Sequence, residues 1–478
     1  MPDQSRKKFI QQISLAGLAL LIPRTPAFGK TPSYKFLECS NENVIYYEKN
    51  SAEYETLRKG FNKRIDKYPK IIALCMNTNG VVEAMQYAAT NNLKLTVKSG
   101  GHCMEGLSCL EGGMVINLSL LNKIEWLDKN TLNVGPACTL KNIYETVIPA
   151  GKYLPGGSCQ SVAIGGLTLG GGYGLMSRNF GLTCDSLLEA TMVTGERKII
   201  NTKDDPELLW ALKGGGNGNF GVVTQMKFNL QQTPGTMQSY KFRNKTSDVH
   251  VAKETCRQWF ELSKTLPDTC FSAFIFNGRT TYILLTNIGK NNTAVSDFID
   301  HFKAASTKFT QGKKLPLAKA LKAYYAEANP LTFKNASAGL YKDFADIEPV
   351  VEQVFTLIKK KPGILYQVNT LGGKIQSPFF EQSSSFAHRD CFYFSELQAY
   401  WDSAAATSGF LAQFELIQQQ FVQAGVKAQY RNYPDINFKD WARLYYGKNV
   451  ERLSAVKAKY DPGNIFGGLQ TLGNAGKL

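Results

Sequence analysis

The sequence predicts an α+β protein in two parts, and three observations lead to that fold class. Residues 34–231 alternate short β-rich runs with helical segments. Residues 232–427 have a different sequence pattern, with long amphipathic helices and strands of alternating polarity. This pattern predicts an antiparallel sheet backed by helices. Pro234 and Gly235 mark the boundary between the two, and residues 428–478 form a third segment rich in Tyr, Asn and Asp.

Local patterns assign the elements within each part. Residues 71–74 are an apolar run typical of a buried strand, and residues 79–91 have helical spacing, with Val82, Met85 and Ala89 on one face and an Asn cap. Further strands of the first part are expected at residues 93–98, 114–118 and 131–134. In the second part we expect helices at residues 251–266 and 293–309 and strands at residues 271–276, 281–285 and 393–400.

Composition excludes several classes of protein. The 478 residues are 43% hydrophobic and 20% charged, which is enough apolar material for a sizeable core. The net charge of +16 raises the question of nucleic acid, but the basic residues are scattered, and the densest run, residues 359–361, has no zinc-ligand or RNA-binding signature beside it. Ten cysteines in a chain of this length, without a C-x-x-C pair, do not make a disulfide scaffold, and several could still pair if the protein is exported. We therefore expect no nucleic-acid partner and no metal.

The first 29 residues have the pattern of an export signal. Arg6, Lys7 and Lys8 precede a short apolar stretch, and a cleavage region with Pro23 and Ala27 follows it. The start also resembles a twin-arginine signal, with Lys at the second arginine position. An ordinary signal peptide, an uncleaved anchor or an amphipathic first helix of the fold are the alternatives. No second long apolar run occurs, so we expect an exported, periplasmic or extracellular chain whose mature form does not insert stably into membranes.

Three glycine-rich stretches lie in the first part, at residues 98–108, 155–174 and 214–221. None is a G-x-G-x-x-G motif followed by an acidic residue for a ribose, and none is a phosphate loop. Three such stretches in one part argue for backbone amides that line a long anionic cofactor, since unpaired N–H groups favour a pyrophosphate.

The motifs around these glycines carry a family resemblance. Ser-Gly-Gly-His at residues 99–102, Cys-x-x-Val-x-x-Gly-Gly at 159–166, Gly-Gly-Gly-Tyr-Gly at 170–174 and Tyr-Arg-Asn-Tyr-Pro-Asp at 430–435 occur in this order. Together they resemble the berberine-bridge-enzyme-like branch of the vanillyl-alcohol-oxidase superfamily, over nearly all of residues 40–470. The resemblance implies a two-part PCMH-type FAD-binding domain at residues 34–231, a substrate domain at 232–427, and a C-terminal segment at 428–478 that returns to the FAD domain.

The resemblance also implies a covalently bound flavin. In this branch the histidine of Ser-Gly-Gly-His bonds to the 8α-methyl group of FAD and the cysteine of the second loop bonds to C6, which here are His102 and Cys159. Both are nucleophilic side chains, as such bonds require. The other residues expected to bind the cofactor are Ser99, Gly100, Gly101, Ser158, Val162, Gly165, Gly166, Gly171, Gly172 and Asn432.

Oxidation by hydride loss to flavin N5 needs a base for the substrate's hydroxyl proton. By resemblance, Tyr430 lies over the flavin, where it is a candidate for this base, and Tyr173 is a second tyrosine of the active site. Glu396 and Gln398 match a family strand that commonly has Lys and Gln facing the substrate. Gln398 fits, whereas Glu396 departs. Either Glu396 itself accepts the proton, or the match is displaced by one residue.

The resemblance leads to a function. Val162 matches a position beside flavin C4a, where a small residue favours access of O2, so we expect an oxidase that releases H2O2. The substrate implied by alcohol-oxidising members is a sugar, an oligosaccharide or another alcohol. An amine or alkaloid oxidase of the same fold, and a binding module on an inactive flavoprotein fold, are the alternatives.

Overall fold

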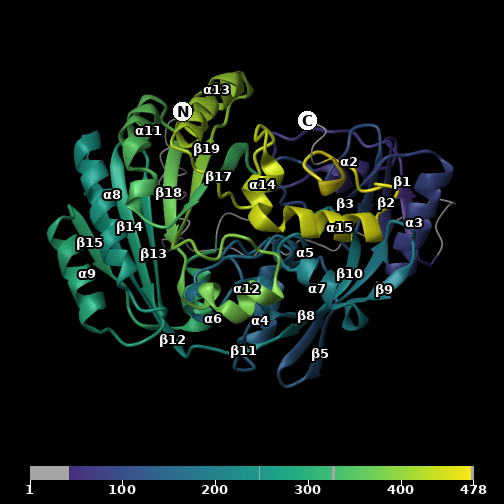
Figure 1. The fold of residues 1–478 in the computed structure, drawn as a ribbon, viewed down its shortest axis with the longest axis horizontal. Helices are drawn as coiled ribbons and strands as arrows, with labels where there is room; N and C mark the ends of the chain where they lie inside the picture. Colours follow the sequence, from purple (N-terminus) through teal and green to yellow (C-terminus); the bar gives the residue numbers. More distant parts are fainter. Residues whose placement is uncertain (1–41, 247, 326–328, 475–478) are drawn as a thin grey trace.

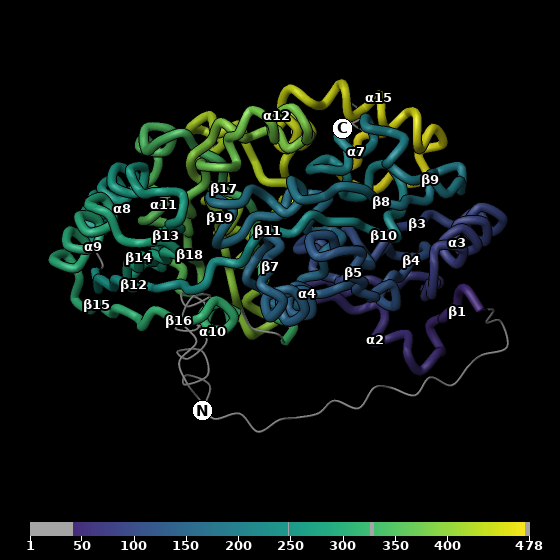
Figure 2. Tube along the Cα trace, turned by 90° about the horizontal axis from the view of Figure 1, so that it is seen from below, coloured from purple at the N-terminus to yellow at the C-terminus, as the bar shows by residue number. Residues whose placement is uncertain are grey.

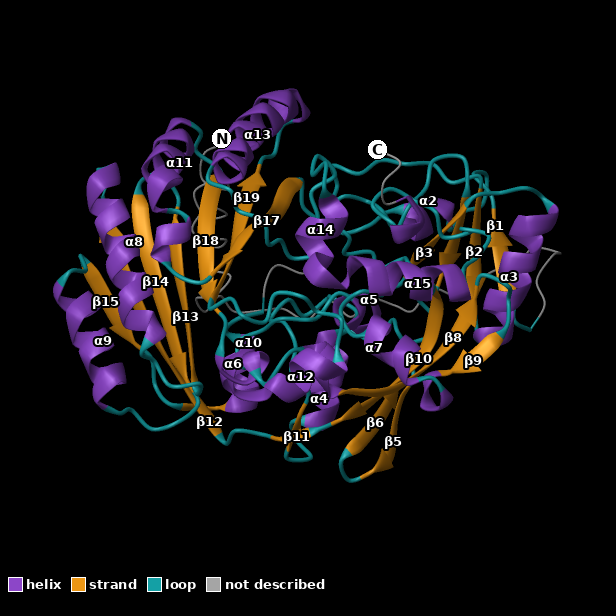
Figure 3. Cartoon of the chain, viewed as in Figure 1, coloured by secondary structure: helices purple, strands orange, loops and turns teal. Residues whose placement is uncertain are grey.

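Two groups of sheets organise the chain (Figures 1 and 3). Residues of both groups line a large cavity. The computed structural model describes residues 42–246, 248–325 and 329–474. The predicted export signal lies outside these residues. Within them, no helix combines the length and the apolar character that a membrane crossing requires.

The first sheet is small and mostly parallel. Its order is β1 (Val44–Tyr47), β2 (Ile71–Cys75), β4 (Met114–Asn117) and β3 (Leu95–Lys98). Helix α3 (Thr78–Thr90) connects β2 to β3, and the side chain of Asn77 caps it by accepting a hydrogen bond from the amide of Gly80. Met85 is buried as expected, but Val81 and Ala88 are buried with it in place of Val82 and Ala89. The sequence is apolar at both sets of positions, and packing against the sheet decides between them.

The second sheet is antiparallel and five-stranded. Its order is β5 (Ile124–Asp128), β6 (Thr131–Val134), β10 (Gly221–Asn229), β8 (Leu187–Thr194) and β9 (Ile199–Asn201). A two-stranded pair joins β7 (Lys152–Tyr153) to β11 (Gln231–Gln232). Short helices fill the rest of this half: α2 (Tyr54–Arg58), α4 (Leu140–Val147), α5 (Ile164–Leu169), α6 (Ser177–Phe180) and α7 (Pro206–Leu212).

The third sheet is a large antiparallel one that begins just after Gly235. Its order is β15 (Lys308–Gln311), β12 (Thr236–Lys245), β14 (Thr280–Asn287), β13 (Cys270–Phe276), β18 (Ile364–Thr370), β19 (Tyr393–Tyr400) and β17 (Phe333–Tyr341), and β16 (Leu315–Pro316) pairs with β12. Helices α8 (Val249–Lys264), α9 (Thr293–Ala304), α11 (Glu348–Lys360) and α13 (Thr407–Gln423) cover its outer face (Figure 1). Apolar side chains such as Trp259, Phe274 and Phe355 fill the layer between them. The predicted α+β class and the antiparallel sheet backed by helices are confirmed.

The helix expected at residues 293–309 was predicted too long. Helix α9 ends at Ala304, and residues 308–311 form the edge strand β15, which pairs with β12. The apolar Phe309 continues the helical pattern by sequence, but in the structure it packs on Phe242 across the strand pair.

The C-terminal segment returns to the first half of the molecule (Figure 2). Helices α14 (Trp441–Tyr446) and α15 (Val450–Tyr460) contribute Trp441 and Leu453 to the same core as Leu208 and Trp210. Two further helices, α10 (Leu317–Lys322) and α12 (Pro378–Ser383), lie on connections of the large sheet.

A buried ionic cluster joins three distant segments. Lys334 of β17 lies 2.5 Å from a carboxylate oxygen of Glu105 and 2.8 Å from one of Asp435, and Arg64 contacts Glu105 at 3.1 Å. The side chains of Lys334, Glu105 and Asp435 are 4% exposed or less. The loop that follows His102 and the C-terminal segment are thereby attached to the large sheet.

Removal of the central cation should destabilise the protein strongly. Lys334→Met leaves Asp435 buried without a cation, and breaking a buried pair costs about 3–5 kcal/mol. Chemical unfolding of the protein with FAD bound measures this loss of unfolding free energy. Lys342→Met is the matched control, because Lys342 pairs with Asp390 on the surface and its side chain is 64% exposed; its unfolding midpoint should stay unchanged. Equal midpoints for both variants would show that the buried cluster contributes nothing.

Candidate active site

A single cavity of about 1780 Å³ lies between the glycine-rich loops and the inner face of the large sheet. Pockets for one drug-sized ligand usually measure about 300–1,000 Å³, so this cavity has room for a long cofactor and a substrate together. The predicted residues that line it are Ser99, Gly100, Gly101, His102, Ser158, Cys159, Val162, Gly165, Gly166, Tyr173, Glu396, Gln398, Tyr430 and Asn432.

The wall formed by the glycines is bare backbone. A Cβ atom added at Gly166 or Gly218 would meet no protein atom within 4 Å, and both residues line the cavity. Gly101 has φ +72°, a conformation that favours glycine. Such a wall lets a flat ring system and a pyrophosphate approach the main chain closely, so the residues present fit a flavin dinucleotide.

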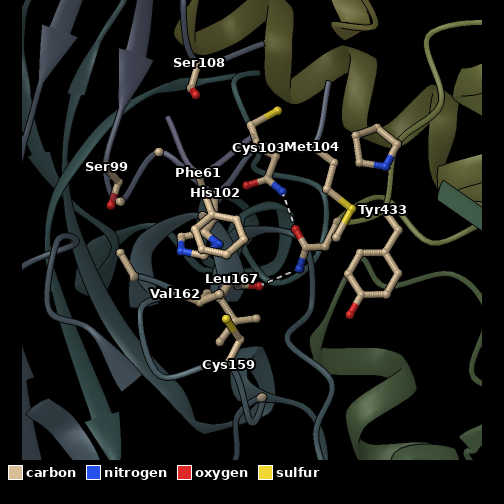
Figure 4. Close-up of a pocket in the computed structure, with 18 of the residues that line it drawn as sticks. Phe61, Ser99, His102, Cys103, Met104, Ser108, Cys159, Val162, Leu167 and Tyr433 are labelled. Atoms are coloured by element: carbon tan, nitrogen blue, oxygen red, sulfur yellow. Dashed lines mark hydrogen bonds between the residues drawn. The ribbon is translucent and has the colours of Figure 1, made fainter. Parts of the chain in front are cut away.

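His102 and Cys159 lie close together, joined by a residue that the sequence analysis missed. The Oγ of Ser161 is 3.0 Å from Nε2 of His102 and 3.7 Å from Sγ of Cys159. The imidazole also stacks on the ring of Phe61, with centroids 4.3 Å apart (Figure 4). Nothing but the spacing of two residues from Cys159 could have indicated Ser161 in the sequence, because its neighbour His102 is 59 residues away.

Burial sets the protonation of both side chains. It lowers the pKa of His102 to about 4 and raises the pKa of the Cys159 thiol, which the hydrogen bond to Ser161 partly opposes. At neutral pH the imidazole is therefore uncharged and has a free lone pair, whereas the thiol keeps its proton.

Tyr430 lies at the junction of the C-terminal segment and the second glycine-rich loop. Its hydroxyl accepts hydrogen bonds from the amides of Gly172 (3.0 Å) and Tyr173 (3.2 Å) and from the side chain of Asn432 (3.0 Å). Gly171 and Gly172 are buried and do not line the cavity. Gly171 lies against Phe386 and Tyr430, and Gly172 lies against Thr183 and donates its amide to the Tyr430 hydroxyl. Burial raises the pKa of Tyr430 to about 12, although the three N–H donors favour the ionised form.

Asn432 connects this tyrosine to the glycine-rich loops. Its side chain donates to the carbonyl of Leu167 (2.9 Å) and accepts from the side chain of Asn217 (2.7 Å), as the dashed lines in Figure 4 mark. Tyr173 lies between the loops and the sheet, with its ring edge-to-face on Phe394 at 5.5 Å. Both residues thus help to hold the two halves of the cavity together.

Glu396 and Gln398 face the cavity from β19. Glu396 pairs with Gln367 and Gln398 with Leu365 on β18, and the fully buried Leu397 between them points to the opposite, helix-covered face. Since side chains alternate along a strand, this register puts both predicted residues on one face. Glu396 and Gln398 therefore share the cavity-facing side of β19.

Glu396 is a buried carboxyl group on this polar face. Burial raises its pKa to about 7, while hydrogen bonds from Asn369 and Gln398 act in the opposite direction. A carboxyl group with a pKa near 7 is half ionised at neutral pH, which suits a general base.

Four more polar residues surround Glu396, and the sequence analysis missed them. The side chains form a hydrogen-bonded chain that runs from Asn335 to Tyr400 (2.9 Å), to Gln398 (2.9 Å), to Gln367 (3.5 Å) and to Asn369 (2.8 Å). The sequence does contain a pattern that indicates two of them: Gln367 and Asn369 alternate with apolar residues in a mostly apolar strand, as residues on a polar face would. The Oδ1 atom of Asn335 is buried without a hydrogen-bond partner, although the residue lines the cavity. Such an acceptor is suited to a hydroxyl donor on a ligand.

No group of His, Cys, Asp and Glu side chains that could hold a metal ion occurs in residues 42–246, 248–325 and 329–474. The nine cysteines in these ranges have free thiols. The side chains that line the cavity include carboxyl, hydroxyl, imidazole and thiol groups, and its glycine-lined half has room for one further group.

Comparison with known proteins identifies that group. The profile of a family described as "FAD binding domain" matches residues 69–203, and that of "Berberine and berberine like" matches residues 429–470. The chain is an FAD-linked oxidoreductase, and the glycine-lined cavity fits that class. More particularly, it resembles the berberine-bridge-enzyme-like proteins in both matched segments, so the resemblance seen in the sequence and the expected FAD are confirmed.

The relatives come from bacteria, fungi and plants. The chain is 28% identical to an uncharacterized FAD-linked oxidoreductase of Bacillus subtilis, over 87% of this chain and 94% of the relative. It is 26% identical to the glucooligosaccharide oxidase of Sarocladium strictum, over 89% and 91% of the two chains. Among solved structures, the BBE-like 1 protein of Physcomitrella patens superposes with a TM-score of 0.80 at 22% identity, over 88% of this chain and 95% of that one.

Proposed function

We propose that this protein is an FAD-dependent oxidase that oxidises a hydroxyl group of a carbohydrate or another alcohol. The observation that carries the proposal is the polar inner face of the large sheet, where Glu396 has a pKa of about 7 and Asn335 has an unsatisfied acceptor. Carbohydrates present many hydroxyl groups, and a row of amide and hydroxyl side chains is suited to binding them. The names of two relatives, a glucooligosaccharide oxidase and a chitooligosaccharide oxidase, support this substrate class.

In the proposed reaction, FAD and four residues of the cavity have different roles. FAD, when bound, supplies the two-electron acceptor that takes a hydride from the carbon bearing the hydroxyl group. Glu396 accepts the hydroxyl proton, and Gln398 and Asn335 orient the substrate through hydrogen bonds. Tyr430 holds the turn at Gly172 and Tyr173 in place through its three hydrogen bonds and closes the cavity beside the sheet.

We further propose that His102 and Cys159 bond covalently to the flavin, and that O2 reoxidises it to give H2O2. The side chains of His102 and Cys159 contact the same serine hydroxyl, and both line the glycine-rich half of the cavity. Val162, a small residue, also lines this half. Export to the periplasm or the cell exterior is proposed from the pattern of residues 1–29.

A substrate screen with peroxide detection tests the function. The purified enzyme is incubated with mono- and oligosaccharides, other primary and secondary alcohols, and amines, and H2O2 is measured. We expect peroxide with carbohydrates or alcohols. Peroxide with amines alone would overturn the proposal, and flavin reduction without peroxide would make the enzyme a dehydrogenase.

The covalent attachment is tested by single substitutions. Cys159→Ala should leave all flavin attached through His102, because the two bonds involve different atoms of the ring. Acid precipitation, flavin measurement in the pellet and mass mapping of flavin peptides give the result. Cys103→Ala is the matched control, since Cys103 is another cavity-lining thiol, next to His102, and both bonds should remain. Double attachment in Cys159→Ala would show that a different residue makes the second bond.

A further inference from the structure

Ser161 occupies a special place in the site, behind both residues proposed to hold the flavin. Its hydroxyl contacts Nε2 of His102 at 3.0 Å and Sγ of Cys159 at 3.7 Å, but Ser161 does not itself line the cavity. Ser161 can therefore act on the cofactor only through His102 and Cys159.

The surroundings of His102 leave one ring nitrogen for the cofactor. Phe61 stacks on the ring at an interplanar angle of 20°, and Ser161 engages Nε2. In the described part of the chain, Nδ1 makes no hydrogen bond. A neutral imidazole that donates its Nε2 proton to Ser161 therefore has its lone pair on Nδ1, which is the form that can attack carbon.

Cys159, unlike His102, is not in its reactive form at neutral pH. Only the thiolate is strongly nucleophilic, and burial keeps the Cys159 thiol protonated at neutral pH. The hydroxyl of Ser161 is the side-chain group within hydrogen-bonding distance of its sulfur, and that hydroxyl is linked in turn to Nε2 of His102. The three side chains thus form a path along which a proton can leave the thiol.

We propose that Ser161 is a positioning residue for flavin attachment: it holds His102 with Nδ1 free to bond and then carries the thiol proton of Cys159 to Nε2. The inference rests on the covalent attachment proposed above. In the first step an N–C bond forms, one C–H bond of the 8α-methyl group breaks, and Nε2 gives up its proton. In the second step an S–C bond forms, the C6–H and S–H bonds break, and the S–H proton passes through Ser161 to the vacant Nε2. Each step releases two electrons, and O2 takes them up with two protons as H2O2.

A matched pair of variants isolates the hydroxyl group. Threonine and valine have the same shape, so Ser161→Thr keeps the hydroxyl and Ser161→Val removes it at equal volume. The full chain is produced at neutral pH, precipitated in acid, and mapped for flavin peptides at both positions over time. We expect Ser161→Val to form the His102 bond more slowly than the wild type and the Cys159 bond at least tenfold more slowly, and Ser161→Thr to form both as the wild type does. Ser108→Ala, a serine on the cavity wall without contact to either residue, should also form both.

Raising the pH gives a second readout that a packing role would not affect. Above the pKa of the thiol, Cys159 loses its proton to solvent, so the Cys159 bond should form in Ser161→Val as it does in the wild type. Full double attachment in Ser161→Val at neutral pH would overturn the role of Ser161 alone. A wild-type protein whose flavin is released by acid would overturn the attachment itself, and the relay with it, while leaving the oxidase function to the substrate screen.

Discussion

Replacement of Glu396 by Gln is expected to slow oxidation of the alcohol substrate by about 10²–10⁴, the usual contribution of a general base. Glutamine keeps the shape and the hydrogen-bonding capacity of the side chain but cannot accept a proton. The measurement is anaerobic reduction of the flavin by substrate, followed by stopped-flow absorbance. Glu381→Gln is the control, because Glu381 pairs with Lys448 on the surface, and its reduction rate should be that of the wild type.

The dependence of the flavin-reduction rate on pH gives a second test of Glu396 as the base. A base works only when deprotonated, and burial puts the pKa of Glu396 at about 7. The reduction rate of the wild type should therefore be constant above pH 7 and fall tenfold per pH unit below it. In Glu396→Gln this dependence should vanish together with most of the rate. A wild-type rate in Glu396→Gln would assign the base to another residue.

Tyr430→Phe should lower the reduction rate by about 10², because small displacements of reacting groups have effects of that size. The phenyl ring keeps the packing against Phe394, but the amides of Gly172 and Tyr173 and the side chain of Asn432 lose their acceptor. We expect normal FAD loading, since the hydroxyl does not contact His102 or Cys159, the residues proposed to attach the flavin. Flavin content and anaerobic reduction rates measure both.

The same variant decides between two bases. With Glu396 as the base, Tyr430→Phe should keep the wild-type pH profile with its midpoint near 7. If the profile disappears in Tyr430→Phe but persists in Glu396→Gln, Tyr430 is the base, as the resemblance alone suggested. The order of the pKa values, about 7 against about 12, favours Glu396.

The sequence was most informative where function depends on backbone. Clustered glycines and the residues between them identified the cofactor wall and the family, because a close approach to the main chain requires glycine locally. It was least informative where function depends on pairing between distant strands. Asn335 and Gln398 face the same cavity only because β17 and β19 pair in one register, and no local pattern fixes that register.

Contacts between residues far apart in the sequence also explain why the helix at residues 293–309 was predicted too long and why the role of Glu396 stayed open. Phe309 fits a helical pattern as well as a strand, and the pairing of β15 with β12 decides its conformation. Glu396 departs from the family pattern, so resemblance alone could not assign its role. The burial that raises its pKa arises from the folded sheet, and it turns this departure into a candidate base.

The hydrogen bond between Gly172 and Tyr430 joins residues 258 positions apart. During translation at about 5–20 residues per second, roughly 13–50 s separate the appearance of the two residues. For all of that interval the glycine-rich loops exist without the segment that closes them. The flavin pocket is therefore completed only after residue 430 has been made, so a ribosome that stalls or terminates before that point leaves a chain with the cofactor loops and without the segment that closes them.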